Sequence, residues 1–157
     1  MSNSSAISDW KNKIISDLHN DEYFLDVLGT TEEEREDLVY TRIFPYYYIP
    51  DTITKVSTYI LIEIDIRSTS RYNVYSYPMI TFTVLCHQDD MTLRMAGVSA
   101  TRADYLAELI DNKYNGAQGF GIGQLELKSN IAGSLNEKFR YRQLIFQGVD
   151  MNKRLCK

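Results

Sequence analysis

Two segments of the chain place apolar residues three or four positions apart, which is the spacing of a helix with one buried face. The first begins near Ser8, a candidate N-cap, and reaches about His19, with apolar residues at Ile7, Trp10, Ile14 and Leu18. The second follows Thr101, also a candidate N-cap, and ends at Asn115 and Gly116, with apolar residues at Ala103, Leu106, Ala107, Ile110 and Tyr114. Each helix needs a second layer to cover its apolar face.

The region after the first helix is mostly polar. Asp21 is placed to cap a short helical turn that Gly29 would end. Residues 30–37 contain the run EEERED. We therefore expect an exposed acidic loop or loose helical turn there, outside the core.

Four further segments alternate apolar and polar residues with a period of two, as half-buried strands do. Residues 59–66 and 79–87 should form one hairpin, whose inward faces carry Ile60, Ile62, Ile64 and Ile66, and Ile80, Phe82, Val84 and Cys86. Its long tip would hold Arg71, Tyr72, Asn73, Val74 and Tyr75. Residues 124–130 and 138–149 should form a second hairpin, after a glycine-rich run at residues 116–123.

These elements predict an α+β fold in the order helix, strand, strand, helix, strand, strand. We expect a two-layer domain in which the two hairpins join in one antiparallel sheet and both helices pack on one face. A chain of 157 residues is enough for one such domain. Residues 150–157 would form a short basic tail.

A tyrosine-rich segment lies between the acidic run and the first strand. The sequence YTRIFPYYYIPDT, residues 40–52, places two prolines around three consecutive tyrosines. Proline fixes its own φ and favours extended geometry in the residue before it. Phe44 and Ile49 should therefore be extended, and the segment should form an ordered, non-helical strap that turns at Pro50-Asp51. Tyrosine suits interfaces, because its ring can be buried while its hydroxyl stays polar.

The net charge of −4 hides an uneven distribution. Residues 1–40 carry 3 basic and 10 acidic side chains, whereas residues 121–157 carry 7 basic and 3 acidic ones. If the fold keeps these parts separate, copies could stack or form a ring head to tail; the alternative is ordinary solvation. No signal peptide or membrane-length apolar stretch is visible, so we expect synthesis in the cytoplasm, free cysteines and no membrane partner.

No residues have the spacing of a catalytic, metal or cofactor site, so we predict that the protein is not an enzyme and takes no cofactor. His87 beside Asp89 and Asp90 is interpreted as a solvated strand end. Cys86 cannot form a couple with His87, because neighbours on a strand point to opposite faces.

Two other motifs also have structural explanations. Glu63 and Asp65 share one strand face, where paired carboxylates can do acid–base work; a sheet edge or an intersubunit contact is favoured instead. The run GFGIG at residues 119–123 leaves a helix and enters a strand, which is the wrong context for a phosphate-binding loop.

A basic strand face near the C-terminus is a weak candidate for contact with a lumen or with DNA. Lys138, Arg140 and Arg142 supply the charge, while Phe139 and Tyr141 alternate to the other face and cannot stack on bases there. With a pI near 5.2, we expect at most transient contact with passing DNA.

The strap, the isoleucine-rich strand and the later GFGIGQLELKS together resemble the small neck and tail-completion proteins of tailed bacteriophages that infect Gram-positive bacteria. The resemblance covers roughly residues 37–149. Tail terminators of this class have an α+β fold with a central antiparallel sheet flanked by helices. They form a hexameric ring that caps the tail tube and joins it to the head connector. The resemblance thus implies a structural protein of the virion neck. Its partners would be its own copies, the tail tube protein and a head-completion or connector protein.

The same resemblance indicates which residues would meet these partners. The tip residues Arg71, Tyr72, Asn73 and Tyr75 would reach onto the tube. The strap residues Tyr46, Tyr47 and Tyr48 would make an intersubunit or connector contact. The alternatives are a head-completion stopper or another neck protein, a small DNA-binding regulator that uses the basic hairpin, and a small enzyme built on His87.

Overall fold

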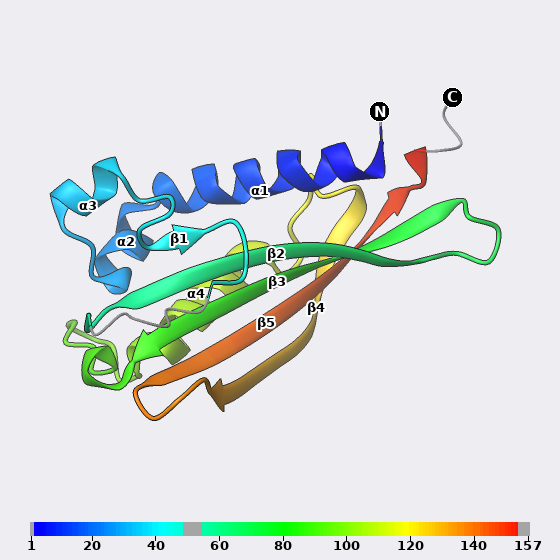
Figure 1. Cartoon of the computed structure of the whole chain (residues 1–157). Coiled ribbons are helices and arrows are strands. Elements are labelled where there is room, and N and C mark those ends of the chain that lie inside the picture. Colours follow the sequence, from blue (N-terminus) through cyan, green and yellow to red (C-terminus); the bar gives the residue numbers. More distant parts are fainter. Residues whose placement is uncertain (1, 49–54, 154–157) are drawn as a thin grey trace.

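The computed structural model describes residues 2–48 and 55–153 and shows a five-stranded sheet with helices on one face (Figure 1). In chain order the elements are α1 (Asn3–His19), α2 (Glu22–Leu28), α3 (Glu32–Glu36), β1 (Ile43–Phe44), β2 (Thr58–Thr69), β3 (Tyr75–His87), the 3-10 turn η1 (Gln88–Asp90), α4 (Arg102–Tyr114), β4 (Ile122–Ser134) and β5 (Phe139–Met151).

Both predicted hairpins are present and lie in one sheet with the strand order β1-β2-β3-β5-β4. β2 pairs with β3, and β4 pairs with β5, each antiparallel. The hairpins join through β3 and β5, with Phe82 opposite Leu144 and Cys86 opposite Arg140. β3 therefore lies at the centre of the sheet and fixes the register of the other long strands.

The main core lies between this sheet and the helices. Ile62 and Phe82 from the sheet and Ile14 and Ile110 from the helices are fully buried in it. The ring of Tyr114 stacks on Phe82 with centroids 4.9 Å apart. Both long helices thus cover one face of the sheet, as the helical spacing predicts.

A second, smaller cluster occupies the opposite face at one end of the sheet. Its buried members are Phe44, Tyr59, Leu61, Leu85 and Phe139. The strap supplies Phe44, so this end of the sheet is covered on both faces. The sequence pattern did not predict this second cluster.

Near the N-terminus the structure corrects one local prediction and decides between the two alternatives of another. α1 is capped by Ser2 and begins at Asn3, and not near Ser8, because Ala6 adds one more buried turn to the helix. Of the two alternatives for residues 30–37, an exposed loop or a helical turn, the structure has the helical one: α3 has a capping box of Thr31 and Glu34 and buries no residue.

The strap and the basic tail also differ from expectation. Ile43 and Phe44 form β1, which runs parallel to β2, so the sheet is mixed and the predicted element order is incomplete. β5 extends to Met151, so the first two residues of the expected tail belong to a strand. Ile49 and the predicted turn at Pro50-Asp51 lie outside the described residues, as do residues 154–157 of the tail.

Arg42 connects the acidic segment to the sheet. Its side chain is nearly fully buried and donates to the carbonyl oxygens of Thr58 at 2.8 Å and Leu28 at 2.7 Å. It also pairs with a carboxylate oxygen of Glu34 at 2.9 Å. A buried guanidinium with three acceptors is well satisfied, and this network holds α3 against the first residues of β2.

We expect Glu34→Gln to weaken the protein at neutral pH more than at acidic pH. Burial alone would raise the pKa of Glu34, but hydrogen bonds from Thr31 and Lys55 and the charge of Arg42 outweigh it, so the pKa lies below its ordinary value of 4.5. The carboxylate therefore stabilises the fold above that value, and the contribution is lost as the pH falls through the lower, folded pKa.

Urea unfolding from neutral pH down to about pH 3 measures the difference in the free energy of unfolding between wild type and Glu34→Gln. Glu36→Gln is the control, because Glu36 is exposed on the same helix and has no ion pair among the described residues. A difference for Glu34→Gln that stays constant with pH would contradict the expectation.

Candidate interaction surfaces

The three tyrosines of the strap divide into one partly buried anchor and two exposed rings. Tyr48 stacks on Phe44 with centroids 4.5 Å apart and an interplanar angle of 13°. Tyr46 and Tyr47 are 42% and 48% exposed. The prediction that all three make an outside contact is therefore supported by geometry for Tyr46 and Tyr47 alone.

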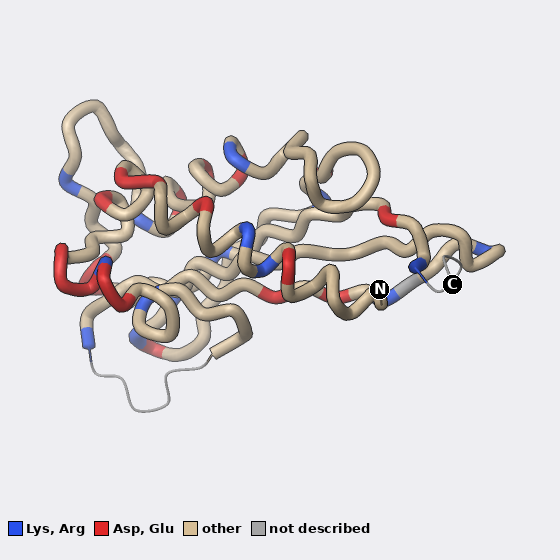
Figure 2. The backbone as a smooth tube through the Cα atoms, turned by 90° about the horizontal axis from the view of Figure 1, so that it is seen from above, with Lys and Arg blue, Asp and Glu red and all other residues tan. Residues whose placement is uncertain are grey.

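The exposed rings lie beside an acidic surface. Tyr40, 62% exposed, has its ring 6.2 Å from that of Tyr46. It follows α3, on which the exposed acidic residues without an ion pair in the described chain are Glu32, Glu33 and Glu36. We call α3 together with Tyr40, Tyr46 and Tyr47 the acidic edge. Figure 2 shows acidic positions, coloured red along the backbone, grouped at one end of the molecule.

The tip of the β2–β3 hairpin extends beyond the body at the other end (Figure 1). Tyr72 is 79% exposed, and the guanidinium of Arg71 lies 5.9 Å from the centre of its ring. The turn is ordered by Asn73, whose φ is 56° and whose side-chain oxygen accepts a hydrogen bond from Thr69 at 2.8 Å. Tyr75, 43% exposed, is already the first residue of β3.

The predicted tip and strap residues do not form one site. The tip projects from one end of the sheet, whereas the strap lies at the other end beside the start of β2 (Figure 1). Any partner of the tip is therefore separate from a partner of the strap. This separation suits a protein that contacts two neighbours at once.

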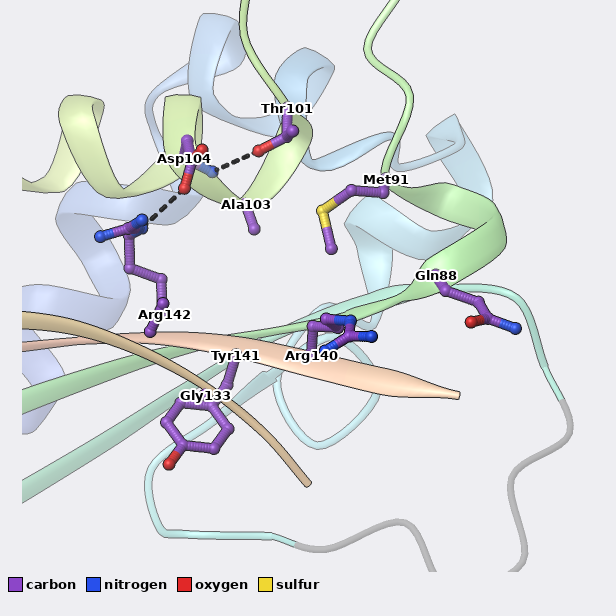
Figure 3. A pocket seen from close by; sticks show the side chains of 10 residues that line it. Gln88, Met91, Thr101, Ala103, Asp104, Gly133, Arg140, Tyr141 and Arg142 are labelled. Carbon is purple, nitrogen blue, oxygen red and sulfur yellow. Dashed lines mark hydrogen bonds and ion pairs between the residues drawn. The ribbon is translucent and has the colours of Figure 1, made fainter. Parts of the chain in front are cut away.

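A cavity of about 300 Å³ lies between the first turn of α4 and the start of β5 (Figure 3). Arg142 reaches up to Asp104, with Nε and Oδ1 2.6 Å apart, and also donates to Asn130. Arg140 also lines the cavity, and within the described chain its guanidinium donates only to the hydroxyl of Ser134. Lys138 precedes β5 and is exposed. The expectation that Arg140 and Arg142 share a face is confirmed.

The residues considered for acid–base or metal chemistry do not converge. His87 is buried, not solvated as expected, because Phe139 packs edge-on against its ring at 5.1 Å. Its Nδ1 accepts a hydrogen bond from the backbone of Asp89. Asp90 instead accepts from Thr58 at 2.6 Å. Within residues 2–48 and 55–153 no three His, Cys, Asp or Glu side chains are grouped to hold a metal ion.

Cys86 and the two strand carboxylates have structural surroundings. Cys86 faces the helices, away from His87, and burial raises the pKa of its thiol to about 11, so it stays protonated near neutral pH. Glu63 accepts from Lys11 at 2.5 Å, and Asp65 lies 3.3 Å from Arg67. The interpretation of these carboxylates as sheet-edge residues fits this geometry.

A protein-family model described as YomW matches residues 12–147. The chain belongs to the YomW family. This family is associated with phages, since the name is that of a protein from the SPbeta phage region of Bacillus. Curated proteins provide no match to the chain. No helix of this YomW-family chain within its described part is long and apolar enough to cross a membrane.

Sequence reasoning missed Tyr40 and the cavity. Tyr40 is the first letter of the strap motif, but its exposure depends on a φ of 68° that returns the chain towards β1. The cavity brings together Arg140, Met91 and Asp104 from three separate segments. In the sequence, the only indication of this cavity was the alternation that placed Arg140 and Arg142 on one strand face.

Replacing Tyr46 and Tyr47 with Ser should leave the free energy of unfolding within about 0.5 kcal/mol of wild type per residue, because both rings are exposed. Phe44→Ala, at a position only 5% exposed, should cost about 3–5 kcal/mol. Urea unfolding followed by circular dichroism measures both. A loss of more than about 2 kcal/mol for Tyr46→Ser would assign that ring to the fold and not to a partner.

Proposed function

We propose that this phage-associated protein is a structural component of the virion neck. It assembles as a ring, of six copies as the resemblance implies, that ends the tail tube and joins it to the head connector. The role needs no catalysis and no cofactor. The observation that carries the proposal is that, over the described residues, both sides of one sheet keep some unpaired strand edge and the two sides carry opposite charge.

The strand directions support lateral assembly. β4 has no strand partner on its outer side within the described residues, and β2 has none beyond Leu61. β2, β3, β5 and β4 alternate in direction across the sheet. A second copy placed with its β2 beside β4 therefore continues the sheet as an antiparallel pair.

Charge supports the same arrangement. The acidic edge lies on the β1 side of the sheet, and Arg140 and Lys138 lie on the β4 side. Contact between unlike edges is heterologous, and such contacts produce rings when the rotation closes. Opposite charges on the two edges favour this order and disfavour like edges meeting.

A ring of this kind would end tube growth and join the tail to the head by its position alone. Seated on the last tube ring, it leaves no site for further tube subunits, and its other face is presented to the head. The projecting hairpin tip is the proposed tube contact. Tyr46 and Tyr47 are the proposed contact with the connector or a neighbouring subunit. Arg140 and Arg142 line a cavity and not a flat strand face, so contact with passing DNA is the weaker role for them.

Deleting the gene from its phage should give tails of abnormal length, separate from DNA-filled heads, when lysates are viewed by negative-stain electron microscopy. Expression of the wild-type chain from a plasmid should restore joined particles. Tails of normal length beside unjoined heads would instead assign the ring to the head side, as a stopper. Normal virions without the gene would refute the neck role.

The variant with Arg71→Ser and Tyr72→Ser should fold as wild type yet fail to bind isolated tail tubes, because both side chains project from an exposed turn. Co-sedimentation of the purified variant with tubes measures binding, and a loss on the order of tenfold or more is expected. Tyr23→Ser, exposed on α2, is the matched control. Equal binding by all three proteins would exclude the tip as the tube contact.

A further inference from the structure

One of the two arginines in the cavity beside α4 has no counter-charge within the described residues. Arg142 is neutralised by Asp104 and held by Asn130. Arg140, on the same face of β5, donates only to an uncharged hydroxyl in that part of the chain. Its guanidinium therefore keeps donors that are free to bind a carboxylate in bidentate geometry.

The shape of the cavity limits what can occupy it. About 300 Å³ is available, and Met91, Ala103 and Ala132 provide apolar walls. An acidic side chain with a short apolar stem fits such a space, because its methylene groups meet the walls while its charge meets Arg140. The backbone of a nucleic acid duplex is too broad to enter, so DNA is a poor occupant.

The pairing of the strands places this cavity opposite the acidic edge. Thr58 of β2 pairs with Cys86 of β3, which pairs with Arg140 of β5, which pairs with Ser134 of β4. These residues form one row across the sheet. At the β2 end of the row, Arg42 binds both the carbonyl of Thr58 and the carboxylate of Glu34 on α3.

α3 and the cavity thus lie at the two ends of one cross-strand row. A second copy displaced along that row brings its α3 to the cavity of the first, at the same height along the strands. α3 offers exposed carboxylates without an ion pair in the described chain, at Glu32, Glu33 and Glu36. The second copy keeps the same orientation as the first, so the contact does not require it to be turned upside down.

We propose that the cavity between α4 and β5 binds a glutamate of α3 from a second copy of this chain. The inference rests on the proposed ring and names the contact that specifies its head-to-tail order. Glu32 and Glu33, in the first turn of α3, are the candidate occupants. Each copy gives one acidic helix and receives another, so every interface in the ring is the same.

A charge exchange tests the contact in the phage itself. The cavity variant is Arg140→Glu, and the helix variant combines Glu32→Lys with Glu33→Lys. Each is expressed from a plasmid in cells infected by the phage that lacks the gene. Arg94→Glu is the control, since Arg94 is exposed, has no ion pair in the described chain and does not line the cavity.

Each of the two exchanged variants alone should reduce the plaque titre by on the order of a hundredfold or more, because like charges then face one another. Arg94→Glu should complement as wild type. Expressed together, the cavity and helix variants should restore the titre. In a ring of alternating copies, the acidic cavity of one variant receives the lysines of the other, and the unchanged cavity receives unchanged glutamates. Two misfolded chains cannot rescue one another, so rescue also excludes a folding defect.

The failure of this inference is distinguishable from failure of the neck role. If Arg140→Glu complements as well as Arg94→Glu, or if co-expression does not rescue, the cavity does not hold α3, while restoration by the wild-type plasmid leaves the neck role intact. If deleting the gene leaves virions normal, the neck role fails and the contact fails with it.

Discussion

The pairing of β3 with β5 is the constraint on which the rest of the structure depends. It joins two hairpins that could otherwise each form alone, and it places Phe82 beside Leu144 in the main core. Isolated two-stranded hairpins are only marginally stable in water, whereas four joined strands packed under helices bury a continuous apolar face. A shift of one residue in this register would turn every core residue of β5 to the opposite face, and it would also separate Arg140 from the row that leads to α3.

Periodicity predicted the elements with strong local signals and missed those set by distant contacts. The α4 boundaries at Thr101 and Asn115 follow from local capping and were predicted closely. α3 and β1 are too short to show a period. Their places depend on contacts with distant residues: Arg42 joins α3 to Thr58, and β1 pairs with Ile60 and Leu61. The sequence likewise could not say that Tyr48 is an anchor while Tyr46 is exposed, because that depends on where Phe44 packs.

Several features limit strand pairing at the free edges of the sheet. These features explain why assembly would be specific. Unprotected edges promote uncontrolled strand pairing. Near β2, Lys11 binds both Glu63 and the carbonyl of Pro45. On β4, the register shifts between Leu127 and Ser129 interrupt a straight edge. Edge pairing alone is therefore a weak basis for association along the whole strand length.

The proposed contact between copies lies at the end of the sheet that holds Thr58 and Ser134, where β1 already pairs with Ile60 and Leu61 of β2. Over its described residues the chain has unpaired carboxylates at one side of that end and, at the other, a guanidinium in a cavity without a carboxylate partner. Solvation alone would account for exposed glutamates on a short helix. Arg140 is exposed as well, but it lies beside apolar walls and next to a second arginine that has its own carboxylate. Of the two arginines, Arg142 is bound within the subunit, and Arg140 is the one that the proposed contact uses.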